Sequence, residues 1–150
     1  MKVLKIIAII LLLTFVGIQF IPTTRNHSDI VPATDLMETY NVPEQVEVIF
    51  KTSCYNCHSN NTIYPWYNKI QPVSWIMEGH IKEAKAELNF NEFGSYSERR
   101  QKSKFKSILS QIKDGEMPLE SYTWMHREAK LSENEKMALE DWINKMLESL

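Results

Sequence analysis

The sequence predicts an all-α chain, with a small domain of about four helices preceded by an N-terminal transmembrane helix. Three observations support this fold class. Apolar side chains recur at helical spacing in several separate segments, one long apolar run begins the chain, and residues that typically start or end helices stand at the segment boundaries. At 150 residues, the chain is long enough for one soluble domain with its own core.

The first 21 residues are expected to anchor or export the chain. Lys2 and Lys5 give a basic start, and the run Ile6–Ile21 is almost entirely apolar. Residues 3–21 would make about 28 Å of helix, close to the thickness of a bilayer core. Because the lysines favour a cytoplasmic N-terminus, we expect a single-pass anchor in the bacterial inner membrane with the remaining chain in the periplasm. The alternative is a cleaved signal, which would leave a soluble periplasmic protein.

Residues 22–41 are polar and lack a sustained period, so they are interpreted as a linker, and residues 42–150 as the domain. Four helices are expected in that domain. The first has about ten residues, begins at Pro43 and leads into Cys54; the second covers about 72–88; the third begins with a capping box of Ser95 and Glu98 and ends at Gly115; the last begins with a capping box of Ser132 and Glu135.

The sequence Cys54-Tyr55-Asn56-Cys57-His58 is the attachment motif of a c-type haem. Two thiols at this spacing can form thioethers with the two vinyl groups of one porphyrin, and the next residue, His58, can bind the iron. Three alternatives exist: a zinc site, a thioredoxin-like redox pair and a structural disulfide. The chain has no other cysteine to complete a zinc site, no strand pattern precedes the motif, and a disulfide this short would constrain almost nothing.

A Met-Pro pair, Met117-Pro118, stands in a loop between two predicted helices. A thioether is a suitable sixth ligand for haem iron and stabilises the ferrous state. His80 on the second helix is the main alternative ligand, His126 is a weaker one, and an open sixth position is the last. Aromatic side chains that follow the motif, at Tyr64, Trp66 and Tyr67, are expected to pack against the porphyrin.

Composition excludes several other functions. The net charge of −2 shows no electrostatic footprint for nucleic acid, and the four glycines are too scattered to form a phosphate-binding loop. Beyond residue 21 the chain has 15 basic and 19 acidic side chains, which would suit a redox partner with a basic patch. The cationic stretch Arg99–Lys106 is interpreted as a solvated helix face, with docking to an acidic partner as the alternative.

The chain resembles the small monohaem cytochromes c, and more closely the exported bacterial proteins of the haem-binding domain family. The resemblance covers roughly residues 40–150 and includes Ser53–Ser59, Tyr64–Tyr67 and Met117-Pro118. It implies a cytochrome c-like domain around one covalently bound haem c, with Cys54 and Cys57 as attachment sites. It also implies His58 as the proximal iron ligand, Met117 as the distal ligand, and packing of Phe50 on the last helix.

We therefore expect one-electron transfer between redox partner proteins on the outer side of the inner membrane, and a carrier rather than an enzyme. A haem-based sensor or gas-binding protein with an open or weak distal site is one alternative. A small peroxidase is another, for which only His80 and Arg127 are available as acid–base groups.

Overall fold

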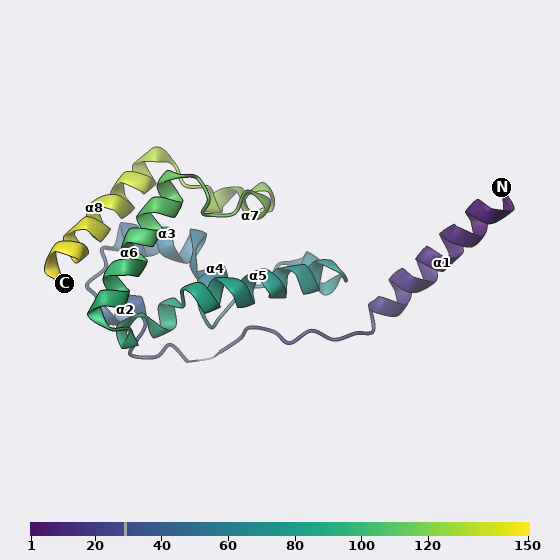
Figure 1. Ribbon diagram of the computed structural model, residues 1–150, viewed down its shortest axis with the longest axis horizontal. Helices are drawn as coiled ribbons and strands as arrows, with labels where there is room; N and C mark the ends of the chain where they lie inside the picture. Colours follow the sequence, from purple (N-terminus) through teal and green to yellow (C-terminus); the bar gives the residue numbers. More distant parts are fainter. Residues whose placement is uncertain (29) are drawn as a thin grey trace.

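The computed structural model describes residues 1–28 and 30–150 and confirms the all-α class. Within these residues it has eight α-helices, three short 3₁₀ helices and no strand (Figure 1). The α-helices are α1 (Lys2–Ile18), α2 (Leu36–Thr39), α3 (Glu44–Ser53), α4 (Tyr55–His58), α5 (Val73–Glu87), α6 (Glu98–Lys113), α7 (Glu120–Met125) and α8 (Glu133–Ser149). The 3₁₀ helices are η1 (Trp66–Lys69), η2 (Phe90–Ser95) and η3 (Arg127–Ala129).

The four helices expected in the domain correspond to α3, α5, α6 and α8. The capping box that begins α8 is present: the backbone N–H of Glu135 bonds to the Ser132 hydroxyl and the Glu135 carboxylate bonds back to the Ser132 backbone. The box predicted at Ser95 is wrong, because Ser95 ends η2 and Ser97 caps α6 instead. The 3₁₀ turn brings Phe90 and Phe93 into the core, so α6 begins two residues later than the local pattern indicated.

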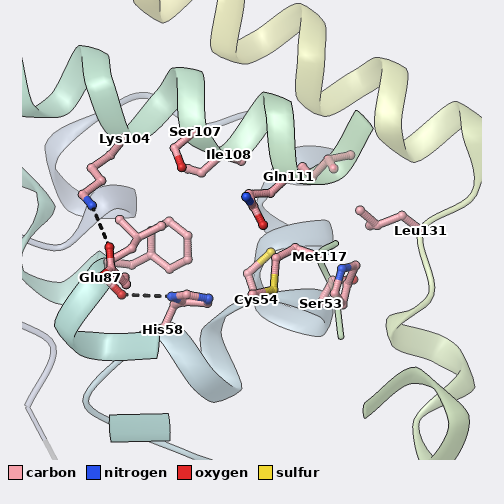
Figure 2. Close-up of a pocket in the computed structure, with 14 residues that line it drawn as sticks. Ser53, Cys54, His58, Glu87, Lys104, Ser107, Ile108, Gln111, Met117 and Leu131 are labelled. Carbon is pink, nitrogen blue, oxygen red and sulfur yellow. Dashed lines mark hydrogen bonds and ion pairs between the residues drawn. The ribbon is translucent and has the colours of Figure 1, made fainter. Parts of the chain in front are cut away.

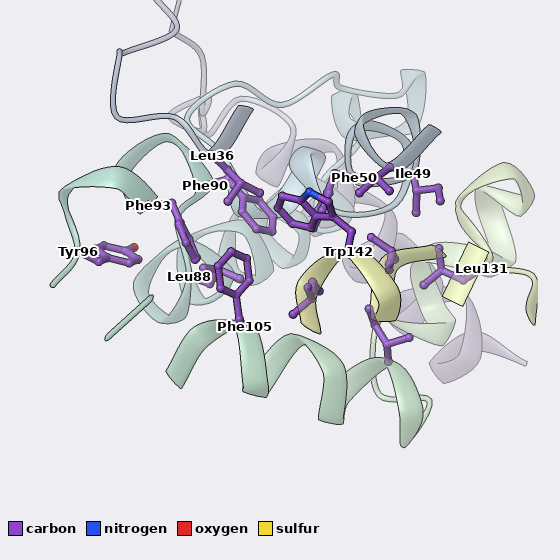
Figure 3. Close-up of a cluster of buried hydrophobic side chains, with 14 residues drawn as sticks. Leu36, Ile49, Phe50, Leu88, Phe90, Phe93, Tyr96, Phe105, Leu131 and Trp142 are labelled. Carbon is purple, nitrogen blue, oxygen red and sulfur yellow. The ribbon is translucent and has the colours of Figure 1, made fainter. Parts of the chain in front are cut away.

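The core lies where α3 and α8 cross beside α6 and η2 (Figure 3). Phe50 of α3 is fully buried and meets the Trp142 ring of α8 edge-on, with centroids 5.7 Å apart. This contact is the one expected between Phe50 and the last helix. Phe105 of α6 packs against the same tryptophan at 5.7 Å. These aromatic contacts join the three helices and hold the C-terminal end of α3, which carries the cysteine motif, in a fixed position.

The N-terminal helix differs from the expectation. In the described residues, no helix is both long and apolar enough to cross a membrane, so the predicted transmembrane helix over residues 3–21 is corrected. α1 has 17 residues and ends at Ile18. Two features end it early: the side chain of Gln19 bonds to the backbone of Gln71, and Pro22 disfavours helical geometry at Ile21.

The segment interpreted as a linker is packed against the domain over much of its length. Asp35 and Leu36 are buried, with 1% and 0% of their surfaces exposed. The Asp35 carboxylate accepts hydrogen bonds from the hydroxyl of Tyr55 (2.9 Å) and from the side chain of Asn91 (2.7 Å). The packed domain therefore begins before residue 42, and α2 belongs to it.

Candidate haem site

The cysteine motif lies where α3 ends. Cys54 leaves helical geometry, with φ −127° and ψ −45°, and the chain turns directly into the single turn of α4. The Cys54 carbonyl accepts hydrogen bonds from the backbone N–H of Cys57 (3.2 Å) and of His58 (3.0 Å). This turn places the Cys54 thiol and the His58 imidazole at one corner of the fold, between α5 and α6 (Figure 2), and Cys57 lines a neighbouring cavity at the same corner.

The His58 ring is held by a backbone carbonyl. Its Nδ1 lies 3.0 Å from the carbonyl oxygen of Leu88, and because a carbonyl can only accept, Nδ1 carries the proton (Figure 2). Nε2 is therefore the nitrogen left with a lone pair for a metal. Burial lowers the pKa of His58, which keeps the ring neutral at physiological pH, as a metal ligand must be. The acceptor residue, Leu88, directly follows the last residue of α5.

Both cysteines are free thiols, partly buried in the fold. Burial, with a smaller contribution from Cys57, raises the pKa of Cys54 to about 12, and burial also raises the pKa of Cys57. Thiol redox sites show the opposite shift, because they need a thiolate at neutral pH. Among the residues that the structure describes, no group of three or more His, Cys, Asp or Glu side chains is placed to hold a metal ion. The direction of the cysteine pKa shifts is therefore opposite to that of a dithiol oxidoreductase.

Two cavities adjoin the motif and share one wall. Their volumes are about 350 and about 320 Å³, and Cys54, His58 and Met117 line both of them. The first extends along α6, where Lys104, Ser107, Ile108 and Gln111 line it (Figure 2). The second extends along α5 to His80, Glu83 and Ala84 and reaches Cys57 and Tyr122. A porphyrin has a flat apolar body with two carboxylates, and this mixture of apolar walls and polar ends suits it.

Met117 reaches the cavities because of the turn that ends α6. Gly115 has φ +75°, a conformation that glycine adopts without strain, and the chain reverses there. The carbonyl of Gln111 then accepts hydrogen bonds from the backbone N–H groups of Glu116 (2.9 Å) and Met117 (3.2 Å). The expected distal ligand therefore lies beside Cys54 and His58. His80 is exposed. Of the two cavities that Cys54, His58 and Met117 line, it borders only the second.

The other histidine considered, His126, has both ring nitrogens occupied. Its Nδ1 lies 3.2 Å from a carboxylate oxygen of Glu128 and its Nε2 lies 2.7 Å from the hydroxyl of Tyr67. The carboxylate can only accept, so Nδ1 donates to it, and Nε2 accepts from the tyrosine. His126 is therefore not arranged as an iron ligand.

Of the three aromatic residues expected to pack on the porphyrin, only Tyr67 lies at a cavity with a cysteine. That cavity has a volume of about 370 Å³ and is also lined by Cys57, His80 and Tyr122. Tyr64 points elsewhere, and its hydroxyl accepts the backbone N–H of Asn26 (2.6 Å). Trp66 is 71% exposed. Neither Tyr64 nor Trp66 lines the cavities beside the motif.

Sequence reasoning missed two groups that organise the site. Lys104 and Glu87 line the first cavity as a pair, with Nζ and carboxylate oxygen 3.6 Å apart. Asn26 holds the loop after the motif: its side-chain N–H group donates to the carbonyl of Ser59 (2.8 Å) and to the hydroxyl of Thr62 (2.9 Å). Lys104 lies in a cationic stretch interpreted as solvated, and a lone asparagine in a polar segment gives no sequence signal.

Comparison with known proteins agrees with this geometry. The family model described as a haem-binding domain matches residues 13–145, which is most of the chain. No curated protein and no solved structure matches the chain significantly.

Proposed function

Because the chain belongs to the haem-binding domain family, we propose that it binds one haem c covalently through Cys54 and Cys57 and transfers single electrons. The observation that carries the proposal is the state of His58. Its Nδ1–H is bonded to the Leu88 carbonyl, so Nε2 is available as the proximal ligand beside two cavities that also contain Cys54. When bound, the haem supplies an iron that alternates between the ferric and ferrous states.

The protein side chains then have distinct roles. The two cysteine sulfurs attach the porphyrin, which makes retention of the haem independent of the iron bonds. The Leu88 carbonyl fixes the His58 ring and increases its basicity as a ligand. Met117 is the proposed distal ligand, because it lines both cavities together with His58, and its thioether favours the ferrous state. Lys104 supplies a positive charge at the α6 end of the first cavity, where a propionate would be stabilised.

A carrier suits this site better than an enzyme. A peroxidase needs an open iron with acid–base groups on the distal side. His80 is exposed, and Arg127 does not line either shared cavity. The one observation that favours a gas-binding protein is the second cavity, which continues past Met117 to His80 and Tyr122 and has room for a small ligand. That alternative requires Met117 to leave the iron free.

We place this activity on the outer side of the bacterial inner membrane. Lys2 and Lys5 in the first turns of α1, followed by its apolar remainder, are typical of the start of an export signal, and c-type haem is attached after export. The redox partners are proposed to be proteins of the same compartment.

Absorption spectroscopy of the chain matured with haem-attachment machinery tests the proposal. We expect haem that stays with the protein after denaturation and acid–acetone extraction, a low-spin spectrum in both oxidation states and no response to carbon monoxide. The ferric form should show the weak far-red band of methionine sulfur bound to iron. Haem that is extracted by acid–acetone would contradict covalent attachment, and a high-spin spectrum that responds to carbon monoxide would favour the gas-binding alternative.

A further inference from the structure

The segment that carries Met117 and α7 is not held in place by burial. From residue 113 to residue 128, all of which the structure describes, no side chain is buried. Trp124 of α7 is 79% exposed. The nearest buried side chains are Ile112 before this segment and Ala129 after it. Burial therefore fixes the two ends of the segment, and other contacts must fix α7 between them.

Polar and ring contacts connect α7 to the rest of the domain. The side-chain N–H of Asn56, which belongs to the cysteine motif, donates a hydrogen bond to the Tyr122 hydroxyl (2.8 Å). The Tyr67 hydroxyl of η1 donates to Nε2 of His126 (2.7 Å), the residue that directly follows α7. The Tyr122 ring also stacks on the His126 ring, with centroids 4.5 Å apart. We call Asn56, Tyr67, Tyr122 and His126 the α7 network.

A further contact determines the direction of each hydrogen bond. The side-chain oxygen of Asn56 accepts the backbone N–H of Ile63 (3.1 Å), so its amide nitrogen is the atom that faces α7. Glu128 accepts the Nδ1 proton of His126 (3.2 Å), which leaves Nε2 as the acceptor for Tyr67. Burial raises the pKa of Tyr67, so its hydroxyl keeps its proton at neutral pH and remains a donor.

The α7 network and Met117 border the same cavity. Tyr122 lines the cavity of about 320 Å³ together with Met117, Cys57 and His58. Only two residues separate Met117 from the start of α7, and one of them is Pro118, whose ring restricts the backbone. A displacement of α7 would therefore be transmitted to Met117.

We propose that the α7 network positions the sixth iron ligand. Its two hydrogen bonds hold α7, and through α7 they hold Met117 where it can bind the iron. Tyr122 and His126 are thus positioning residues and not iron ligands. This inference rests on the function proposed above, since it names what determines the strength of the Met117 bond. One hydrogen bond contributes a net factor of about five to an equilibrium constant, so loss of one should make release of Met117 about fivefold more frequent.

Substitution of tyrosine by phenylalanine tests this in the full-length, haem-loaded chain, because it removes one hydroxyl and keeps the ring. The test variants are Tyr67→Phe, Tyr122→Phe and the double variant. The matched control is Tyr40→Phe, which also removes one hydroxyl hydrogen bond, to the side chain of Gln101 (2.8 Å), away from the described cavities. Absorption titration of the ferric haem with imidazole measures how readily a competing ligand replaces Met117. Amide hydrogen exchange, with and without haem, measures how often α7 opens.

We expect the apparent affinity for imidazole to rise about fivefold in each single variant and about 20-fold in the double variant, and to stay unchanged in Tyr40→Phe. The α7 amides should exchange faster in the three test variants but not in the control. Unchanged imidazole affinity or unchanged α7 exchange in the double variant would overturn the inference, and so would an equal rise in affinity in Tyr40→Phe. Absence of covalent haem or of the far-red band from the unsubstituted chain would instead refute the proposed function, and α7 exchange would still show whether the network holds this helix.

Discussion

The His58 side of the candidate site and the Met117 side are built in different ways. His58 is bonded to the Leu88 carbonyl and lies against the edge of Phe90, with ring centroids 5.9 Å apart. Phe90 is 1% exposed and also stacks on Tyr55 at 5.0 Å. Met117 is only half-buried, and its position depends on the turn at Gly115 and on backbone bonds to Gln111. The His58 side is thus part of the core, whereas the Met117 side is a loop beside the two cavities.

This difference has a chemical consequence. A ligand fixed by the core keeps its geometry when the iron changes oxidation state, which lowers the reorganisation that electron transfer requires. A ligand on a half-buried loop can be displaced at lower cost than one fixed by the core, so we expect a small ligand such as carbon monoxide to gain access to the iron most easily on the Met117 side. Substitutions on the His58 side should therefore lower the free energy of unfolding most, and substitutions on the Met117 side should mainly change the ligation of the iron.

Phe90→Ala should cause the largest change, because it removes a fully buried ring that packs on Phe50, Tyr55 and His58. We expect the free energy of unfolding to fall by about 3–5 kcal/mol and the haem spectrum to broaden, since the proximal ring loses its support. Phe93→Ala is the matched control, because Phe93 is equally buried and has no described contact with His58. Denaturant unfolding measures the loss of stability in both variants, and absorption spectra report on the haem. Equal spectral changes in the two variants would contradict the support of the His58 ring by Phe90.

Asn26→Ala should have the next largest effect. Its side chain bonds to the Ser59 carbonyl and the Thr62 hydroxyl, and it also accepts a hydrogen bond from Lys85 (2.6 Å). Loss of these bonds should lower the free energy of unfolding by about 2–3 kcal/mol and loosen the loop after the motif, visible as faster amide hydrogen exchange there. Asn61→Ala, in the same loop but exposed, is the control and should change stability by less than about 0.5 kcal/mol.

The start of α8, which packs on α3, gives a smaller and pH-dependent effect. Hydrogen bonds from the Ser132 hydroxyl and backbone lower the pKa of Glu135 from its usual 4.5. A group with a depressed pKa stabilises the fold fully above its unfolded value, and this contribution disappears as the pH falls through the folded value. We expect Glu135→Gln to cost about 1 kcal/mol or less at pH 7 and the difference from the unsubstituted chain to shrink as the pH falls below about 4. A difference that is constant with pH would contradict this.

The sequence predicted the parts of this site that depend on local pattern. The spacing of Cys54, Cys57 and His58, the helical period of α3 and the stop at Gly115 can all be recognised within a few residues. The Leu88 carbonyl that holds His58 is 30 residues away in the chain, and Asn26 is 33 residues from the Ser59 carbonyl. Such contacts depend on how helices pack, and single polar residues leave no periodic signal. For the same reason the end of α1 was misplaced, because Gln19 bonds to Gln71 across the fold.

Met117→Ala tests the Met117 side and should lower the free energy of unfolding by no more than about 1 kcal/mol, because the side chain is half-buried and borders cavities instead of filling the core. Its effect on the iron should be large: the far-red band should vanish and the ferrous haem should bind carbon monoxide. His80→Ala is the control and should leave both properties unchanged. If the far-red band is absent from the unsubstituted chain and His80→Ala opens the iron instead, then α5 supplies the sixth ligand. Both iron ligands would then lie on elements fixed by the core, because α5 carries His80 next to the buried Ile81. Replacement of His80 by another ligand would require α5 to move.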